Sequence, residues 1–296
     1  MTDFLPPDDW SDLLAFHLEA GVDIAVGEEP VDRFAQSAAE QKARAPRGGE
    51  DELETAPAPA ARPAARPAAP RPQPHSPTIA PHSPDEAVMA AREAARGAAS
   101  LEELRALLEA FEGCALKRTA SRLVFADGNP AARVMFVGEA PGRDEDQQGL
   151  PFVGRAGQLL DLMLGAIGLD RSSAYIANII PWRPPGNRTP TPQETAICLP
   201  FIARQIELAD PDVLVCLGGQ SAQALFATTE GITKLRGRFM DYETGTRTIQ
   251  ALATFHPAYL LRTPIGKRLA WRDLLAIEGA LAKSAPRERP PAPGSA

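Results

Sequence analysis

Three polar side chains lie at or directly after apolar runs that have the composition of buried strands. Glu139 and His256 each follow such a run, and Asn178 lies near the end of another. A carboxylate directly after a buried strand is held in a fixed position by that strand. An imidazole can donate or accept a proton near neutral pH. An asparagine amide needs a partner for each of its halves, and a pyrimidine edge supplies one acceptor and one donor. The other possibilities are an asparagine that caps its own loop and a histidine with a structural role.

The surroundings of Glu139 and His256 favour a functional role for both. The chain has four histidines, and the other three lie before residue 85. Glu139 lies in the segment GEAPG at 138–142, and a second glycine-rich segment follows at 149–157. Glycine permits positive φ and lets backbone N–H groups approach a ligand closely. An ordinary turn between a strand and a helix is the alternative.

The elements that must position these residues alternate along the chain. The apolar runs are 133–137, 175–180, 213–217 and 248–255, and the helical patterns between them include 157–167, 192–209 and 221–226. A further helical pattern at 85–111 breaks near Gly97 and restarts at Ser100, where Glu103 completes a capping box. This alternation predicts an α/β fold, a parallel sheet with helices on both faces. Ligands of such sheets bind beyond the carboxyl ends of the strands.

Composition divides the chain into four parts. Residues 46–84 contain 11 of the 30 prolines and almost no large apolar side chains, so we expect a disordered linker. An acidic arm with one short amphipathic helix is predicted for 1–45, and this helix packs on the globular domain or docks on a protein partner. Residues 85–285 suffice for one domain with a single core. A disordered tail is expected at 286–296.

The charge distribution leaves a nucleic-acid partner open. Residues 1–60 carry 14 acidic and 4 basic side chains, a net of −10, and the rest carries 24 acidic and 27 basic, a net of +3. The chain pI near 5.3 therefore does not describe the folded part. Because no run of 18 apolar residues and no signal peptide occurs, we expect a cytoplasmic, nucleoid-associated protein without a membrane partner. Three scattered cysteines are too few for a disulfide framework.

Several motifs occur in an order and spacing that resemble those of family 4 uracil-DNA glycosylases. They are GEAPG at 138–142, GLPFVGRAGQLLD at 149–161, the YIANI and RPPGNRTP segments, and HPAYLLR at 256–262. The resemblance covers about 114–271. It implies a three-layer α/β/α sandwich with a four-stranded, mostly parallel sheet. It also implies a monomeric base-excision-repair enzyme that hydrolyses the N-glycosidic bond of uracil in DNA.

The resemblance assigns the residues that would bind the base. A base inside a duplex is unreachable, so it must be flipped into a pocket. Phe152 would stack against the uracil face, and Asn178 would bind the uracil edge and reject cytosine, whose donor and acceptor are reversed. Gly138 and Ala140 complete this substrate-binding set.

The same resemblance assigns the catalytic residues. His256 would donate a hydrogen bond to the carbonyl oxygen of the departing uracil, where negative charge develops. Glu139 would orient the water and balance the positive charge on the sugar, with Glu145 as support. Ala140 stands where family 1 enzymes carry an aspartate, so the water activation of that class cannot be copied here.

Basic and apolar side chains near these motifs are the expected DNA contacts. The predicted phosphate-binding residues are Arg143, Arg155, Arg188, Arg236 and Arg262, together with Lys234, Arg238 and Lys267. The loop after His256, with Tyr259, Leu260 and Leu261, could supply an apolar wedge that fills the vacated base stack.

The sequence departs from the family at the positions of the cysteines that bind an iron–sulfur cluster in family members. Family members hold a [4Fe–4S] cluster with four cysteines, but here Phe111 and Trp182 replace two of them, so only Cys114 and Cys198 remain. Two thiolates would leave two irons without protein ligands. We therefore expect no cofactor, with Phe111 and Trp182 packing in the former cluster volume.

Three other functions compete with uracil hydrolysis. The first is a catalytically weak uracil- or DNA-binding module, tethered by its arm to replication or mutagenesis machinery. A nucleotide- or flavin-binding domain is less favoured, because no Gly-x-Gly-x-x-Gly or Walker lysine follows a strand. A covalently trapping uracil-binding protein is disfavoured, because the run 183–198 contains no histidine.

Overall fold

The computed structural model describes residues 84–283. The predictions for the arm 1–45, for the linker up to residue 83 and for the tail 286–296 fall outside these described residues. Within the described part, no helix is long and apolar enough to cross a membrane.

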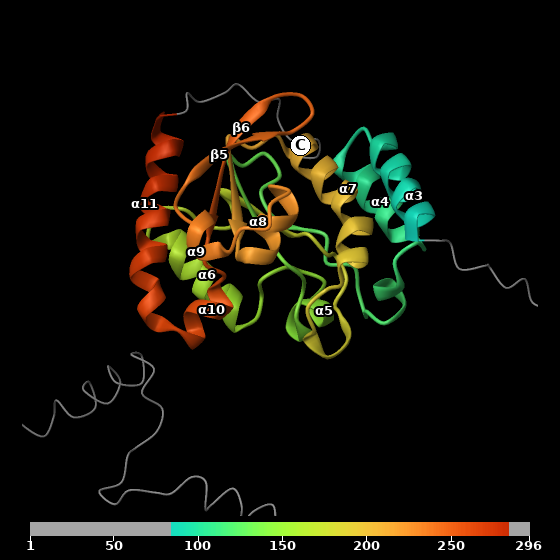
Figure 1. The fold of residues 1–296 in the computed structure, drawn as a ribbon, viewed down its shortest axis with the longest axis horizontal. Coiled ribbons are helices and arrows are strands. Elements are labelled where there is room, and N and C mark those ends of the chain that lie inside the picture. The colour runs from blue at the N-terminus through green and yellow to red at the C-terminus, as the bar shows by residue number, and fades with distance from the viewer. Residues whose placement is uncertain (1–83, 284–296) are drawn as a thin grey trace, which may run out of the picture. The chain divides into compact units, whose positions relative to one another are not determined.

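A six-stranded sheet lies at the centre of the domain (Figure 1). In spatial order its strands are β1 (Asp127–Gly128), β3 (Ala174–Asn178), β2 (Val134–Gly138), β4 (Val213–Leu217), β6 (Thr248–Thr254) and β5 (Phe239–Glu243). The four central strands pair in parallel, as predicted, and β1 and β5 pair antiparallel at the two edges. The edge strands are additions to the prediction: β1 has only two residues, and β5 carries no buried side chain that would mark it.

Side chains of the central strands alternate between two hydrophobic cores. In β2, Val134 and Phe136 pack into one core, and Met135 and Val137 pack into the other. All four are almost inaccessible to solvent. Because both faces of these strands are buried, their sequences are continuous apolar runs rather than alternating apolar and polar residues.

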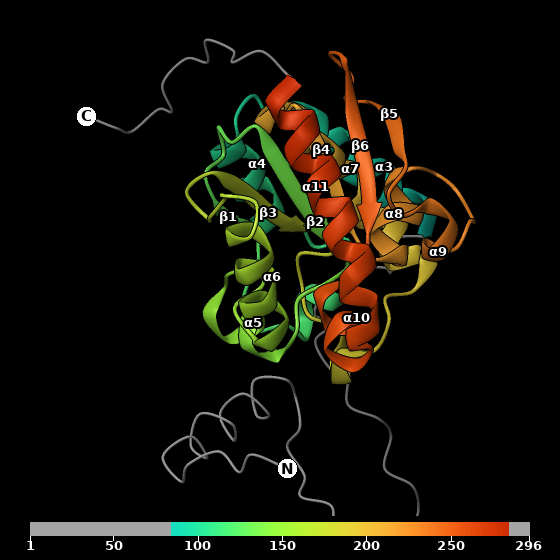
Figure 2. The same ribbon diagram turned by 90° about the vertical axis from the view of Figure 1, so that its left-hand side faces the viewer.

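Helices cover both faces of the sheet and give three layers (Figure 2). The core that contains Met135 and Val137 is covered by α3 (Pro84–Gly97), α4 (Leu101–Ala110), α7 (Pro192–Ala209) and α8 (Gly219–Leu225). The core that contains Val134 and Phe136 is covered by α6 (Arg155–Gly165), α10 (Pro257–Arg262) and α11 (Lys267–Lys283). Two further short helices are α5 (Arg143–Gln148) and α9 (Ile232–Leu235), and single 3-10 turns are η2 (Ala115–Arg118), η3 (Pro185–Asn187) and η4 (Pro264–Gly266).

Local signals explain where several helices begin. At α4, the Glu103 N–H donates to Ser100 Oγ at 3.2 Å, while the Glu103 carboxylate accepts from Ala99 N–H at 2.7 Å rather than from Ser100. The predicted capping box is therefore shifted by one residue on its carboxylate side. The segment after His256, which we expected to be a loop, is instead the helix α10, with Pro257 in its first turn. Proline favours that position because its missing N–H would have no intrahelical partner there.

Candidate active site

The predicted site residues come together at the carboxyl ends of the parallel strands. A cavity of about 490 Å³ lies there. The predicted residues that line it include Glu139, Ala140, Glu145, Phe152, Asn178 and His256. They come from the loops after β2, β3 and β6, which the parallel sheet brings to one edge.

Gly138, the last residue of β2, lets two of these side chains approach each other. A Cβ at Gly138 would lie 2.4 Å from Asn178 Oδ1 and 2.6 Å from Phe152 Cζ, so a larger residue does not fit. Asn178 is buried, and within the described residues its Oδ1 has no hydrogen-bond partner. Leaving such a group unsatisfied costs about 1–3 kcal/mol. The orphan acceptor therefore indicates a ligand that donates a hydrogen bond in the cavity.

Phe152 is held in a strained backbone conformation beside the cavity. Its φ is +55°, a left-handed value that costs a non-glycine residue about 1–3 kcal/mol. A Cβ at Gly157 would lie 1.6 Å from the Phe152 carbonyl oxygen, so the first turn of α6 packs directly against this peptide. The Phe152 ring stacks near the His256 ring, with the centroids 5.5 Å apart.

The protonation state of His256 follows from its contacts. Burial, together with the positive charge of Arg262, lowers the pKa of His256 to about 4, so the imidazole is neutral at pH 7. Its Nδ1 accepts a hydrogen bond from Ala258 N–H at 3.1 Å, as the N-cap of α10. A neutral imidazole carries one proton, which must therefore reside on Nε2. His256 thus offers a neutral N–H donor, in a side chain that lines the cavity.

Two glutamates line the cavity, and their contacts differ. Glu145 Oε1 accepts from Val153 N–H and Gly154 N–H, both at 3.0 Å, and its Oε2 accepts from Gly142 N–H at 3.0 Å. Its carboxylate is thus committed to backbone groups. Among the described residues no hydrogen bond involves the Glu139 carboxylate, and burial raises its pKa. The geometry separates a carboxylate free to meet a ligand from one that holds the surrounding loops together.

The expected DNA-binding arginines fall into three groups. Arg188 and Arg262 line the cavity, and Arg188 forms a two-pronged ion pair with Glu194 at the start of α7. Arg143 and Arg155 are exposed at the starts of α5 and α6. Arg236 is an exception to the expected set.

The Arg236 side chain is 14% exposed, and its guanidinium forms an ion pair and hydrogen bonds within the domain. It pairs with Asp273, with Nε 3.0 Å from Oδ2, and it also donates to the Leu269 carbonyl. Asp273 is 1% exposed and accepts from Thr254 Oγ1 at 2.7 Å. This network joins α11 to β6, and it commits Nε and Nη2 of Arg236 to partners within the domain.

The proposed apolar wedge also needs correction. Leu260 is 1% exposed and belongs to the core beneath α10, because a helix turns this position inward. Tyr259 and Leu261 remain 37% and 38% exposed and can still meet DNA.

The two cluster-type cysteines lie together in the apolar core. Cys114 Sγ and Cys198 Sγ are 4.0 Å apart, and both residues are buried. Trp182 is 2% exposed in the same core, and Phe111 packs edge-on against Phe201.

This environment does not fit an iron–sulfur cluster. Cys216, the third cysteine, lies within β4, where burial raises the pKa of its thiol. Two adjacent thiols in an apolar core do not supply four ligands to a [4Fe–4S] cluster.

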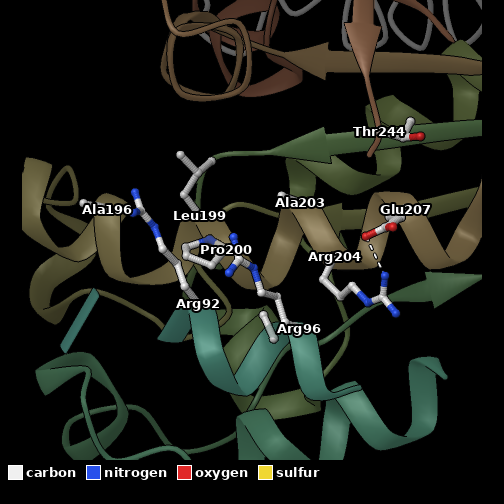
Figure 3. A pocket seen from close by; sticks show the side chains of 10 residues that line it. Arg92, Arg96, Ala196, Leu199, Pro200, Ala203, Arg204, Glu207 and Thr244 are labelled. Atoms are coloured by element: carbon white, nitrogen blue, oxygen red, sulfur yellow. Dashed lines mark ion pairs between the residues drawn. The ribbon is translucent and has the colours of Figure 1, made fainter. Parts of the chain in front are cut away.

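A second hollow, of about 340 Å³, lies between α3 and α7 (Figure 3). Small and apolar side chains such as Ala95, Leu199 and Pro200 form part of its lining. Arg204 is paired with Glu207 at 2.6 Å. The hollow contains no histidine or cysteine and no unpaired carboxylate, so it lacks the groups that acid–base chemistry needs.

Sequence comparisons bear on the same region. The sequence profile of the uracil DNA glycosylase superfamily matches residues 125–275. The type-4 uracil-DNA glycosylase of Archaeoglobus fulgidus is 41% identical over 169 residues, which are 56% of this chain and 85% of that protein. The chain belongs to the type-4 uracil-DNA glycosylase family. The Thermotoga maritima member is 47% identical over 153 residues, 50% of this chain and 77% of its own. The Sulfurisphaera tokodaii member is 37% identical over 183 residues, 60% of this chain and 83% of its own.

Some residues of this type-4 glycosylase domain that shape the cavity were missed in the sequence. Pro184, Asn187 and Thr189 line it from the RPPGNRTP segment, of which only Arg188 had been singled out. The position of this segment directly after a predicted strand was the available signal. Gly218, with φ +98°, directly follows β4, and a Cβ there would lie 3.0 Å from His256 Cβ. That close approach has no signature in the sequence.

Proposed function

We propose that this chain hydrolyses the N-glycosidic bond of deoxyuridine in DNA and so initiates base excision repair. The observation that carries this proposal is the buried Asn178 oxygen without a partner, in the same cavity as a neutral imidazole and an uncommitted carboxylate. Membership of the type-4 family supports the same reaction.

Asn178 selects the base. Its Oδ1 accepts from the N3–H of uracil, and its amide nitrogen donates to O4. Cytosine presents an acceptor at N3 and a donor at position 4, so it would leave both halves of the amide opposed by like groups. Phe152 provides the flat apolar surface for the base, and stacking of this kind contributes about 1–3 kcal/mol.

His256 stabilises the leaving group. As the bond from C1′ to N1 breaks, its electron pair moves onto the uracil ring, and negative charge develops on the carbonyl oxygen O2. The Nε2–H of a neutral imidazole donates to that oxygen without giving up its proton. A preorganised donor of this type contributes about 2.7–4 kcal/mol to catalysis.

Glu139 acts on the sugar side of the bond. Its carboxylate balances the positive charge that develops at C1′, orients a water molecule toward that carbon and takes the proton which the water loses. The raised pKa of Glu139 favours this proton transfer. Glu145 supports the site by holding the peptides of Gly142, Val153 and Gly154.

We further propose that the domain works without an iron–sulfur cluster. The family is known for this group, but two of the four ligand positions are occupied here by Phe111 and Trp182. The packing of Trp182 and the cysteine pair within the core supports this proposal. Action as a cytoplasmic monomer, with the arm 1–45 available to a protein partner, stays a prediction.

The experiment is an excision assay on a labelled oligonucleotide that contains one uracil, followed by alkali. We expect strand scission by the wild-type chain and a loss of about 100- to 1,000-fold in the single-turnover rate for His256→Ala. Glu139→Gln should also be strongly impaired. A mobility shift without scission would instead identify a binding module, and equal activity of Glu139→Gln and wild type would contradict the catalytic assignment.

A further inference from the structure

Two side chains, Glu145 and Arg171, hold the backbone on both sides of Phe152. After Phe152, Glu145 accepts hydrogen bonds from the next two N–H groups, those of Val153 and Gly154. The guanidinium of Arg171 donates to the carbonyl oxygens of both peptides that flank Phe152, the Pro151 oxygen at 3.2 Å and the Phe152 oxygen. A left-handed conformation of a phenylalanine persists only where its surroundings impose it.

Arg171 is itself fixed in place. Its Nε donates to Asp161 Oδ1 of α6 at 2.8 Å, and its Nη1 donates to Asp127 of the edge strand β1. The guanidinium therefore joins β1, α6 and the peptide of Phe152. A fork of five N–H donors can serve two carboxylates and two carbonyls at once, and a lysine ammonium cannot.

Arg171 does not line the cavity, and so it does not touch a bound base. Its effect on the site must pass through Phe152, whose ring lies against the position of Gly138 and 5.5 Å from the His256 ring. A shift of this peptide would move the ring away from the place where a base stacks.

We propose that Arg171 is a positioning residue, which sets the Phe152 ring for uracil stacking by holding the Pro151 and Phe152 carbonyls. This inference rests on the proposed function. It adds Arg171, which lies outside the family motifs quoted above, to the residues that act on the site. Arg171 controls the geometry of the reacting groups rather than the affinity for DNA. The affinity for DNA is assigned to other residues, the exposed arginines near the cavity.

The test compares Arg171→Ala with a matched control, Arg204→Ala. Arg204 has a similar exposure, pairs with Glu207 and donates to the Ala98 carbonyl at 2.7 Å, but lines the hollow between α3 and α7 (Figure 3). We expect Arg171→Ala to lower the single-turnover excision rate about 10- to 100-fold, with little change in binding of uracil-containing DNA. Arg204→Ala should excise uracil at nearly the wild-type rate.

A second readout does not depend on activity. The ring current of Phe152 shifts the NMR signals of the His256 imidazole. The variant Phe152→Leu has no such ring, so its spectrum gives the chemical shifts of His256 in the absence of the ring current. We expect Arg171→Ala to move these signals toward that position and Arg204→Ala to leave them unchanged. Unchanged His256 signals in Arg171→Ala would overturn the proposal, whether or not the wild-type chain excises uracil.

Two further outcomes also test the positioning role of Arg171. A rate for Arg171→Ala within about twofold of wild type, or equal losses in both alanine variants, would overturn the positioning role. If Arg171→Ala does not fold, Arg171→Lys is measured by the same two readouts. A lower rate with shifted His256 signals supports the proposal, and wild-type behaviour of the lysine variant overturns it.

Discussion

At the scale of single residues, burial moves the pKa values of the two groups that we assign to the chemistry in opposite directions. Burial disfavours the charged form of any group, so it raises the pKa of Glu139 and lowers that of His256. For His256 the result is a neutral donor at physiological pH, with Nδ1 already occupied by Ala258 N–H. For Glu139 it is a carboxylate with a stronger affinity for a proton.

The His256 imidazole should therefore stay neutral where other histidines become charged. Its pKa is about 4, below the ordinary value of 6.5, so its NMR signals should not titrate between pH 8 and pH 5.5. The histidines at 17, 75 and 82 provide an internal comparison within the same spectra. A His256 titration midpoint near 6.5 would contradict the neutral-donor mechanism.

The same shift has a consequence for stability. Between pH 6.5 and about pH 4 the unfolded chain binds a proton at His256 that the folded chain does not. The folded state is therefore fully stabilised by this group above pH 6.5, and it loses that contribution as the pH falls toward 4. The loss amounts to about 1.4 kcal/mol for each unit by which the pKa is lowered. His256→Gln should lack this part of the pH dependence in urea unfolding.

At the scale of elements, close backbone contacts build the site as much as side chains do. Gly138 at the end of β2 and Gly157 in the first turn of α6 both lie against Phe152. The strand β2, the helix α6 and the loop that carries Phe152 thus pack so closely that a methyl group added at either glycine would not fit. The chemistry depends on this close packing, because it brings the Phe152 ring next to the His256 ring and lets it approach Asn178 across Gly138.

Two glycines of α6 offer a direct comparison. Gly157→Ala would place Cβ 1.6 Å from the Phe152 oxygen, so we expect a lower melting temperature and a strong loss of excision. In Gly165→Ala, at the other end of α6, nothing lies within 4 Å of the added Cβ, and the variant should be more stable by up to about 1 kcal/mol with unchanged activity. Differential scanning calorimetry and the excision assay measure both effects. Tolerance of alanine at 157 would show that the loop has another well-packed conformation.

At the scale of the whole domain, apolar side chains pack around Cys114 and Cys198, the two cluster-type cysteines that remain. The helices α3 and α4 contact α7, and Trp182, Cys114 and Cys198 lie within that core. Removing a cluster from a protein that needs it costs folding energy, because metal binding and folding are coupled. If the domain works without a cluster, as we propose, its folding has no such dependence.

The purified full-length chain should accordingly carry no stoichiometric iron and no visible absorbance. Its melting temperature should not change on incubation with a chelator, and Cys114→Ala combined with Cys198→Ala should retain excision activity. Elemental analysis and thermal unfolding test this directly. A brown protein with about four irons per chain would contradict it.

The parallel sheet and the place of its ligand site could be predicted from the sequence. The strand at 213–217 was predicted at its observed bounds, because a strand buried on both faces is a short apolar run flanked by polar residues. Glu139, Asn178 and His256 were predicted to converge because parallel strands place their carboxyl ends at one edge. The edge strands β1 and β5 were missed because one is two residues long and the other has no buried face.

The sequence by itself determined the chemical groups of the site, since residue type fixes what a side chain can donate, accept or stack against. Only the tertiary structure decided how each group is used. It commits Glu145 to three backbone N–H groups, turns Leu260 into the core and pairs Arg236 with Asp273. It also brings Arg171 to the Phe152 carbonyl. The two arginine contacts join residues 37 and 19 positions apart in the chain, and the energy of all these contacts depends on distances and burial that no local pattern encodes.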